Sequence, residues 1–294
     1  ERFIDANFLP TGAQISLGMA DIAPCDALFA THWSTADTVR CQQGRAKQLF
    51  YFVQDFEPLF YPIGSPGYTL AEETYKFGFH TITSGPWCAH LLRTRYGLDP
   101  DYFLFPIDRS IYFPAQTPPR PTRRVIFFAR PEMPRRCYPL GLEAFQILKG
   151  RMPDVEVVFF GSDQVDATQL PFPIMDLGVV KDLHELADLY RSADVGVAFS
   201  TTNPSLVPSV VMACGCPVVV NDDNSSQLNY GSPDNVQLVR PLPEEVAVGV
   251  EELLTNEERR QHVIRCGLEY VEKLPTEEKM VRDIEGFILK RFNA

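Results

Sequence analysis

Residues 199–220 read FSTTNPSLVPSVVMACGCPVVV, and this stretch decides the fold. Its last four residues, 217–220, form a largely β-branched run that predicts a strand. Residues 209–214 predict a helix that ends at Gly215. Another predicted strand, 195–199, comes directly before the small polar residues that open the stretch. Strand, helix and strand in such close succession are typical of a parallel α/β sheet.

The same alternation of short apolar strands and amphipathic helices continues on both sides of this stretch. Further strands are predicted at 125–129 and 155–160, and further helices at 140–149, 183–192, 244–254, 257–274 and 277–292. This order is typical of a doubly wound domain, in which ligands bind at the carboxyl ends of the strands.

The first part of the chain shows a shorter version of the pattern. Strands are predicted at 27–31, 48–53, 80–84 and 103–106, with a helix between Gly85 and Gly97. Residues 107–124 contain Pro114, Pro118, Pro119 and Pro121, which favours an interdomain linker. We therefore expect a first domain over 1–115, a second over 116–276, and a terminal helix over 277–294 that packs back toward the first.

Four strands are few for a doubly wound domain, so the first domain is expected to lack upstream strands. The chain opens at Glu1, and Phe3, Ile4 and Asp5 already resemble a strand, so the natural protein is expected to start earlier.

Composition excludes several classes of protein. The net charge of −11 disfavours a broad contact with nucleic acid or anionic lipid. The longest mainly apolar stretch, 210–220, is too short to span a bilayer as a helix. Seven scattered cysteines without paired metal spacing, and no secretory leader, favour reduced thiols in a cytoplasmic protein. No metal site is predicted.

Three arginines follow the predicted strand 125–129. Arg130, Arg135 and Arg136 lie in a loop at the carboxyl edge of the sheet, where guanidinium groups suit bidentate binding of phosphate. The alternative is that each arginine is a solvated surface charge. Three in one loop favour an anion site.

A second candidate anion site lies in the opening stretch. A helix that begins near Ser209 presents free N–H groups and the positive end of its dipole to the same edge. An ordinary capped helix explains the pattern equally well. Two histidines, His32 and His80, also lie near ends of predicted strands, and a structural role is favoured for both over a place in the cleft.

The order of these motifs resembles a known family. F-x-A-R-P, F-G-S-D, L-Y-R-S-A-D-V-G-V-A-F-S, N-P-S and M-A-C-G-C-P-V-V are similar to the C-terminal half of family-4 retaining glycosyltransferases of the GT-B fold. More narrowly, residues 51–61 (YFVQDFEPLFY) and 105–114 (FPIDRSIYFP) resemble bacterial surface-polysaccharide rhamnosyltransferases of the WsaF type. The resemblance implies two Rossmann-like, doubly wound domains that face a cleft, the first incomplete.

The resemblance also implies roles for particular residues. Asp55 and Glu57 would face the acceptor and, with Arg130, form the catalytic set. Arg130 and one of Arg135 or Arg136 would hold the donor pyrophosphate, helped by main-chain N–H groups. The full expected donor set is Arg130, Arg135, Arg136, Gly161, Leu177, Gly178, Val179, Val180, Ser200, Asn203, Pro204, Ser205, Leu206 and Val210.

Within this set the roles differ. Ser205 and Leu206 would supply the N–H groups, residues 177–180 would meet the base, and Asn203 would lie near the sugar. For Asp55 and Glu57, loop hydrogen bonding beside aromatic residues is the simpler alternative. One departure stands out, because the family usually has a glutamate that binds the ribose where this chain has Val210. Either the ribose is held differently, the alignment slips, or donor binding is impaired.

The resulting hypothesis is a metal-independent transferase without a cofactor. It would move rhamnose from dTDP-rhamnose to a saccharide or lipid-linked saccharide with retention, in the cytoplasm or at the inner face of the membrane. The diphosphate would itself take the acceptor proton, so no protein nucleophile is required. The alternative is an inactive nucleotide-sugar-binding or scaffold module within a larger polysaccharide-assembly protein. A dehydrogenase is disfavoured because no G-x-G-x-x-G follows a strand.

Overall fold

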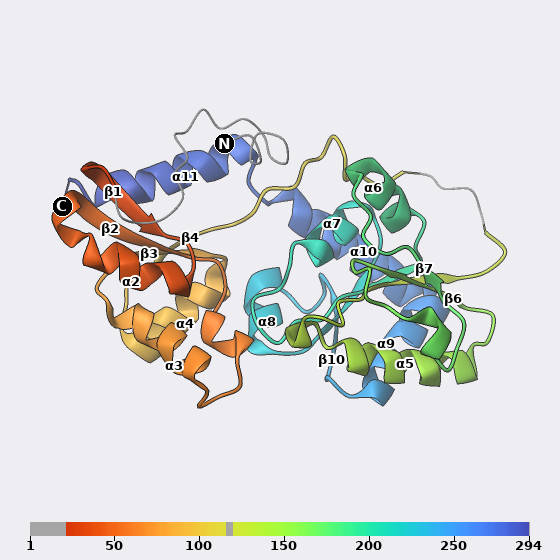
Figure 1. Cartoon of the computed structure of the whole chain (residues 1–294). Helices are drawn as coiled ribbons and strands as arrows, with labels where there is room; N and C mark the ends of the chain where they lie inside the picture. Colours follow the sequence, from red (N-terminus) through yellow and green to blue (C-terminus); the bar gives the residue numbers. More distant parts are fainter. Residues whose placement is uncertain (1–21, 116–119, 294) are drawn as a thin grey trace.

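The computed structural model describes residues 22–115 and 120–293 and contains two parallel β-sheets, one of four strands and one of six. Each sheet belongs to its own α/β half, and the two halves lie side by side (Figure 1). The predicted α/β class with two parallel sheets is confirmed. The strand suggested around Phe3 lies outside the described residues.

The first sheet has the strand order β1-β2-β3-β4, and all pairs are parallel. Its strands are β1 (Cys25–Ala30), β2 (Ala46–Val53), β3 (His80–Ser84) and β4 (Asp101–Phe103). The fourth strand was predicted at 103–106. It ends at Phe103, because only residues 101–103 pair with β3. The helices of this half are α2 (Trp33–Cys41), α3 (Pro66–Glu73) and α4 (Pro86–Tyr96).

Aromatic side chains fill one face of the first sheet. Tyr51, Phe56 and Tyr75 are buried there, and the Phe56 and Tyr75 rings stack with centroids 5.5 Å apart. Burial on this scale supplies most of the free energy that holds a domain together.

The second sheet has the order β10-β9-β8-β5-β6-β7. Its strands are β5 (Arg124–Phe128), β6 (Glu156–Phe160), β7 (Met175–Asp176), β8 (Val195–Val197), β9 (Val218–Asn221) and β10 (Gln237–Val239). Read from β7, the strands follow the chain in the order 3-2-1-4-5-6, which is that of a doubly wound nucleotide-binding domain. The order reverses between β5 and β8, and ligands bind at that point in such sheets.

Helices cover both faces of the second sheet. One face packs on α5 (Tyr138–Arg151) and α9 (Pro243–Thr255), and the other on α6 (Leu183–Arg191), α7 (Val207–Ala213) and α10 (Glu257–Glu272). A further short helix, α8 (Asn224–Tyr230), contacts α4 of the first half. The helix predicted from Ser209 begins two residues earlier, with Pro208 in its first turn.

The last helix, α11 (Glu277–Lys290), returns from the second half to the first. It runs along the first sheet (Figure 1), where Met280, Ile284 and Phe287 pack against the cluster around Phe50. Arg291 then forms an ion pair with Asp101 of β4 at 3.2 Å. No helix within 22–115 and 120–293 is both long and apolar enough to cross a bilayer.

Candidate functional site

The two loops singled out in the sequence meet where the strand order reverses. One follows β5 and carries the arginines on the 3-10 turn η4 (Pro134–Arg136), and the other follows β8. The N–H of Thr201 donates to the carbonyl of Arg135 at 2.9 Å, so the loops are in direct contact. The structure therefore brings both predicted anion-binding segments to one edge of the sheet.

Arg130 lies on the side of this edge nearer β6. Its Nε is 2.6 Å from Oε1 of Glu132, whose other oxygen accepts from Ser162 Oγ at 2.8 Å. Gly161 has a φ of +106°, and a Cβ there would lie 2.6 Å from the Phe128 ring and 3.4 Å from Arg130 Cδ. Glycine is required at this position so that the loops after β5 and β6 can approach each other.

Arg136 is the most enclosed of the three arginines. Its side chain is 8% exposed, and its Nε and Nη1 have no hydrogen-bond partner among the described residues. Burial, together with the nearby Arg135, lowers the pKa of Arg136. A guanidinium buried in this way is costly unless an anion neutralises it.

Arg135 connects the arginine loop, which contains Arg130, Arg135 and Arg136, to the first half. Its guanidinium lies 4.4 Å from the ring centre of Phe60, in the 3-10 turn η2 (Glu57–Phe60). Its Nε is also buried without a partner within the described parts of the chain. The two neighbouring arginines therefore present unsatisfied donors close to the junction of the halves.

A buried polar network, which we name the latch, joins the halves beside these arginines. The Asp55 carboxylate accepts from Thr202 Oγ1 and from the N–H of Asn203, both at 2.8 Å. The Asn203 amide in turn donates to the Gln54 carbonyl at 3.1 Å and to the Ser84 carbonyl at 3.0 Å. Asn203 Oδ1 also accepts from an amide outside the latch, that of Asn229, at 3.2 Å. We define the latch as Gln54, Asp55, Ser84, Thr202 and Asn203.

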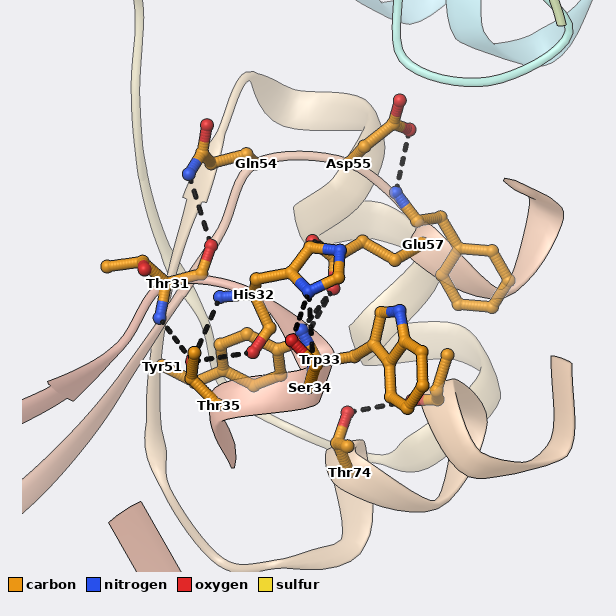
Figure 2. A network of polar contacts seen from close by, with 12 residues as sticks. Thr31, His32, Trp33, Ser34, Thr35, Tyr51, Gln54, Asp55, Glu57 and Thr74 are labelled. Atoms are coloured by element: carbon orange, nitrogen blue, oxygen red, sulfur yellow. Dashed lines mark hydrogen bonds and ion pairs between the residues drawn. The ribbon is translucent and has the colours of Figure 1, made fainter. Parts of the chain in front are cut away.

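The latch changes the expectation for Asp55. The carboxylate does point toward the second half (Figure 2), yet it is bonded to that half instead of facing an open acceptor site. Burial raises the pKa of Asp55, and the hydrogen bonds from Asn203 and Thr202 oppose that rise. Asp55, expected to face the acceptor, and Asn203, expected near the sugar, are in contact with each other.

The expectation that Glu57 faces the acceptor is corrected by the structure. Glu57 is 3% exposed, and its Oε2 accepts from the Trp33 N–H at 2.7 Å and from the Tyr51 hydroxyl at 2.9 Å. Figure 2 shows this carboxylate enclosed in the first half, with His32 beside it. Burial raises the pKa of Glu57. The hydrogen bonds hold the carboxylate inward because they compensate its loss of water.

The segment expected to meet the base lies next to Gly161. The Gly161 N–H donates to the Gly178 carbonyl at 2.8 Å, and the Val179 N–H donates to Asp163 Oδ1 at 2.9 Å. The side chains of Leu177 and Val179 are 40% and 44% exposed. These two exposed apolar side chains flank Gly178, which is bonded to Gly161, and they are available to a flat aromatic base.

Ser205, Leu206 and Pro204 line a small cavity between the halves. It has a volume of about 60 Å³ and also touches Ser84, Gly85 and Asn203 of the junction. Ser200 donates its hydroxyl to the carbonyl of Asn203, one of the lining residues, at 3.1 Å.

Val210 faces a different hollow, which has a volume of about 620 Å³ and is mainly apolar. Its lining includes Ile107, Tyr190 and Leu206. The valine is therefore matched to apolar surroundings, which leaves the three explanations of its place in the family pattern open.

Several residues of the site were not singled out by sequence reasoning. Ser84 ends a predicted strand, and Thr202 lies within the stretch that decides the fold, so their positions gave a signal. Phe60 lies in the aromatic segment 51–61 that carries the family resemblance, but its contact with Arg135 could not be predicted. Asn229 gave no signal, because its role depends on how the halves meet. Within the described ranges, no three His, Cys, Asp or Glu side chains cluster in a way that could hold a metal ion.

Comparison with known proteins follows the same division of the chain. Residues 11–84 match the N-terminal domain of the WsaF family, and residues 123–251 match its C-terminal domain. The O-antigen biosynthesis protein RfbC of Myxococcus xanthus is 32% identical over 273 residues, which are 92% of this chain and 21% of that protein. The chain thus spans about a fifth of the length of this curated relative.

Solved structures share the arrangement of both halves. Sucrose-phosphate synthase from Thermosynechococcus elongatus superposes with a TM-score of 0.73 at 17% identity, over 91% of this chain and 74% of that one. Anabaena HepE in complex with UDP gives a TM-score of 0.71 at 15% identity, over 90% of this chain and 79% of that one. The predicted GT-B fold is confirmed.

Proposed function

Because this chain belongs to the WsaF family, we propose that it is a retaining glycosyltransferase that acts in the synthesis of a bacterial surface polysaccharide. The donor we propose is dTDP-rhamnose, and the acceptor is a saccharide or lipid-linked saccharide at the inner face of the cytoplasmic membrane. The proposal is supported by the similarity to an O-antigen biosynthesis protein of Myxococcus and by the UDP bound in the HepE structure.

The observation that carries the proposal is the buried guanidinium of Arg136, whose Nε and Nη1 have no hydrogen-bond partner among residues 22–115 and 120–293. Arg136 lies at the reversal of strand order, next to Arg135 and in the same loop as Arg130. A diphosphate supplies the negative charge and the acceptor oxygens that these guanidinium groups require as partners. We infer that the donor diphosphate binds there, with its base toward residues 177–180 and its sugar toward the latch.

The chemistry then follows from where charge develops. An acceptor hydroxyl oxygen bonds to the anomeric carbon as the bond from that carbon to the diphosphate oxygen breaks. The leaving oxygen takes the hydroxyl proton on the same face, which gives retention. Arg130, Arg135 and Arg136 stabilise the negative charge of the leaving diphosphate, so the proposal requires no divalent ion and no protein nucleophile.

The direct test is transfer from radiolabelled dTDP-rhamnose to a rhamnose-terminated oligosaccharide, with and without EDTA. We expect product in both reactions. Transfer that stops on chelation would contradict charge stabilisation by the arginines alone.

Arg130→Ala is expected to weaken dTDP binding strongly, and an unchanged affinity would remove Arg130 from the donor site.

A thermal-shift series separates the transferase from an inactive module. We expect dTDP and dTDP-rhamnose to raise the unfolding midpoint more than UDP- or GDP-sugars do. Stabilisation by none of these nucleotides would favour a scaffold, and stabilisation without turnover would favour an inactive binding module.

A further inference from the structure

The cluster around Glu57 contains a histidine that the proposed reaction has not used. His32 follows β1 at the carboxyl edge of the first sheet, the edge that also carries Gln54 and Asp55. Its side chain is 41% exposed, while that of Glu57 is 4% exposed. The histidine, and not the glutamate, is therefore the group that a ligand on this edge can reach.

One nitrogen of the His32 ring has a structural task and the other does not. Nδ1 accepts the N–H of Ser34 at 3.3 Å and thereby caps α2. Nδ1 acceptance places the ring proton on Nε2. Nε2 lies 3.8 Å from Glu57 Oε1, which is too long for a hydrogen bond. Among the described residues Nε2 makes no hydrogen bond, so its N–H is available to a ligand.

The surroundings of His32 suit a sugar. The half-buried Trp33 ring lies 5.7 Å from the imidazole and donates its Nε1–H to the Tyr61 hydroxyl at 3.1 Å. Tyr61 directly follows Phe60, which stacks on Arg135 of the arginine loop. The cluster is therefore continuous with the proposed diphosphate site.

Charge selects the kind of ligand. The Glu57 carboxylate beside Nε2 repels a phosphate or a uronic acid and favours a neutral hydroxyl. We propose that His32 binds a hydroxyl of the neutral acceptor saccharide through Nε2–H. Glu57 is a positioning residue for His32, because its Oε2 accepts the N–H of the adjacent Trp33 at 2.7 Å and so holds the backbone beside the imidazole. This inference rests on the proposed glycosyl transfer, because it names the acceptor side of the same cleft.

The test uses variants that separate the two ring nitrogens. His32→Asn keeps a side-chain acceptor that can cap α2, since Asn is a preferred N-cap, but it removes the Nε2–H donor. Ser34→Ala is the matched control, because it removes the hydroxyl that lies 2.8 Å from Nδ1 and leaves the Nε2–H donor in place. In the full chain we expect His32→Asn to raise the KM for the acceptor about tenfold, with little change in kcat, in dTDP affinity or in the unfolding midpoint.

The role of Glu57 is tested by combining substitutions. Glu57→Gln alone is expected to raise the acceptor KM, and adding it to His32→Asn is expected to have little further effect. Additive effects of the two substitutions would overturn the positioning role.

Acceptor binding can also be read without turnover. Ligand-observed NMR with methyl α-rhamnoside, in the presence of dTDP, should show binding to the wild type and weaker binding to His32→Asn. Equal binding to both, or none to the wild type, would overturn the inference. Failure of the proposed function is distinct, because it appears as absent dTDP binding and absent transfer in the wild type.

Discussion

The three arginines after β5 differ in whether a carboxylate neutralises their charge. Arg130 has Glu132 at 2.6 Å, whereas Arg136 has no partner within the described residues for two of its nitrogens. A sequence shows that arginines share a loop, but it does not show which of them is enclosed. That depends on α8, which brings the buried Tyr230 close to Arg136.

Arg136→Met is therefore expected to have opposite effects on binding and on stability. It should weaken dTDP binding by at least about tenfold, because charge-assisted hydrogen bonds to the diphosphate are lost. It should also raise the free energy of unfolding of the unliganded protein by about 1–3 kcal/mol, because an unpaired buried charge is removed. Isothermal titration and urea unfolding measure the two effects, with the exposed Arg240→Met as control. A destabilised variant would show that Arg136 already has a compensating partner.

The raised pKa of Asp55 gives a pH dependence of known sign. Burial makes the protonated form more favourable in the folded state than in the unfolded chain, where the carboxyl has a pKa of about 3.9. The resulting stabilisation is complete below the unfolded pKa and is lost as pH rises through the folded pKa. The wild type should therefore lose stability relative to Asp55→Asn as pH rises from about 4 through the raised pKa. Urea unfolding of both proteins across this range measures the difference. Both proteins are compared in a Glu57→Gln background, because the Asp55 charge also raises the pKa of Glu57. A difference that does not change with pH would contradict the raised pKa.

For helices and strands, the prediction succeeded where a run of apolar residues is sufficient. Strands β6 and β8 lie within the predicted ranges, and β5 begins one residue before its range, because each strand contains an unbroken run of buried apolar residues. Strand β7 has two exposed residues, and its pairing depends on β6, so composition gives no signal for it. Helix α2 was missed because its cap is the His32 side chain, which is an unusual N-cap.

The contact between α4 and α8 gives a test of how closely the halves meet. Gly85, just before α4, has φ 81° and ψ 163°, a region essentially restricted to glycine. A Cβ there would also lie 2.6 Å from Asn229 Oδ1 of α8. Gly85→Ala should lower the free energy of unfolding by about 1–3 kcal/mol, and adding Asn229→Ala should recover the part due to the contact. The control is Gly44→Ala, because nothing lies within 4 Å of its added Cβ. Equal stability of the two glycine variants in urea unfolding would argue against the close approach.

Across the entire chain, the return of α11 makes the first half depend on residues that follow the second. Phe287 packs on the first sheet, whereas Leu289 of the same helix is 52% exposed. Both tryptophans, Trp33 and Trp87, lie in the first half, so their fluorescence reports that half alone. Phe287→Ala should lower the tryptophan-monitored free energy of unfolding by about 2 kcal/mol, and Leu289→Ala should change it by less than about 0.5 kcal/mol. Similar values for both would mean that α11 does not stabilise the first sheet.

The same fluorescence tests whether the two halves unfold together. The proposed dTDP site lies in the second half, so a nucleotide stabilises the first half only if contacts between the halves, chiefly the latch and α11, couple their unfolding. At a concentration of one hundred times Kd, dTDP should add about 2.7 kcal/mol to the tryptophan-monitored free energy of unfolding of the wild type. In a variant that combines Asn203→Ala with Phe287→Ala, both connections are weakened, and the added free energy should fall toward zero. A gain that persists in this variant would show that other contacts, such as Phe60 with Arg135, are sufficient to join the halves.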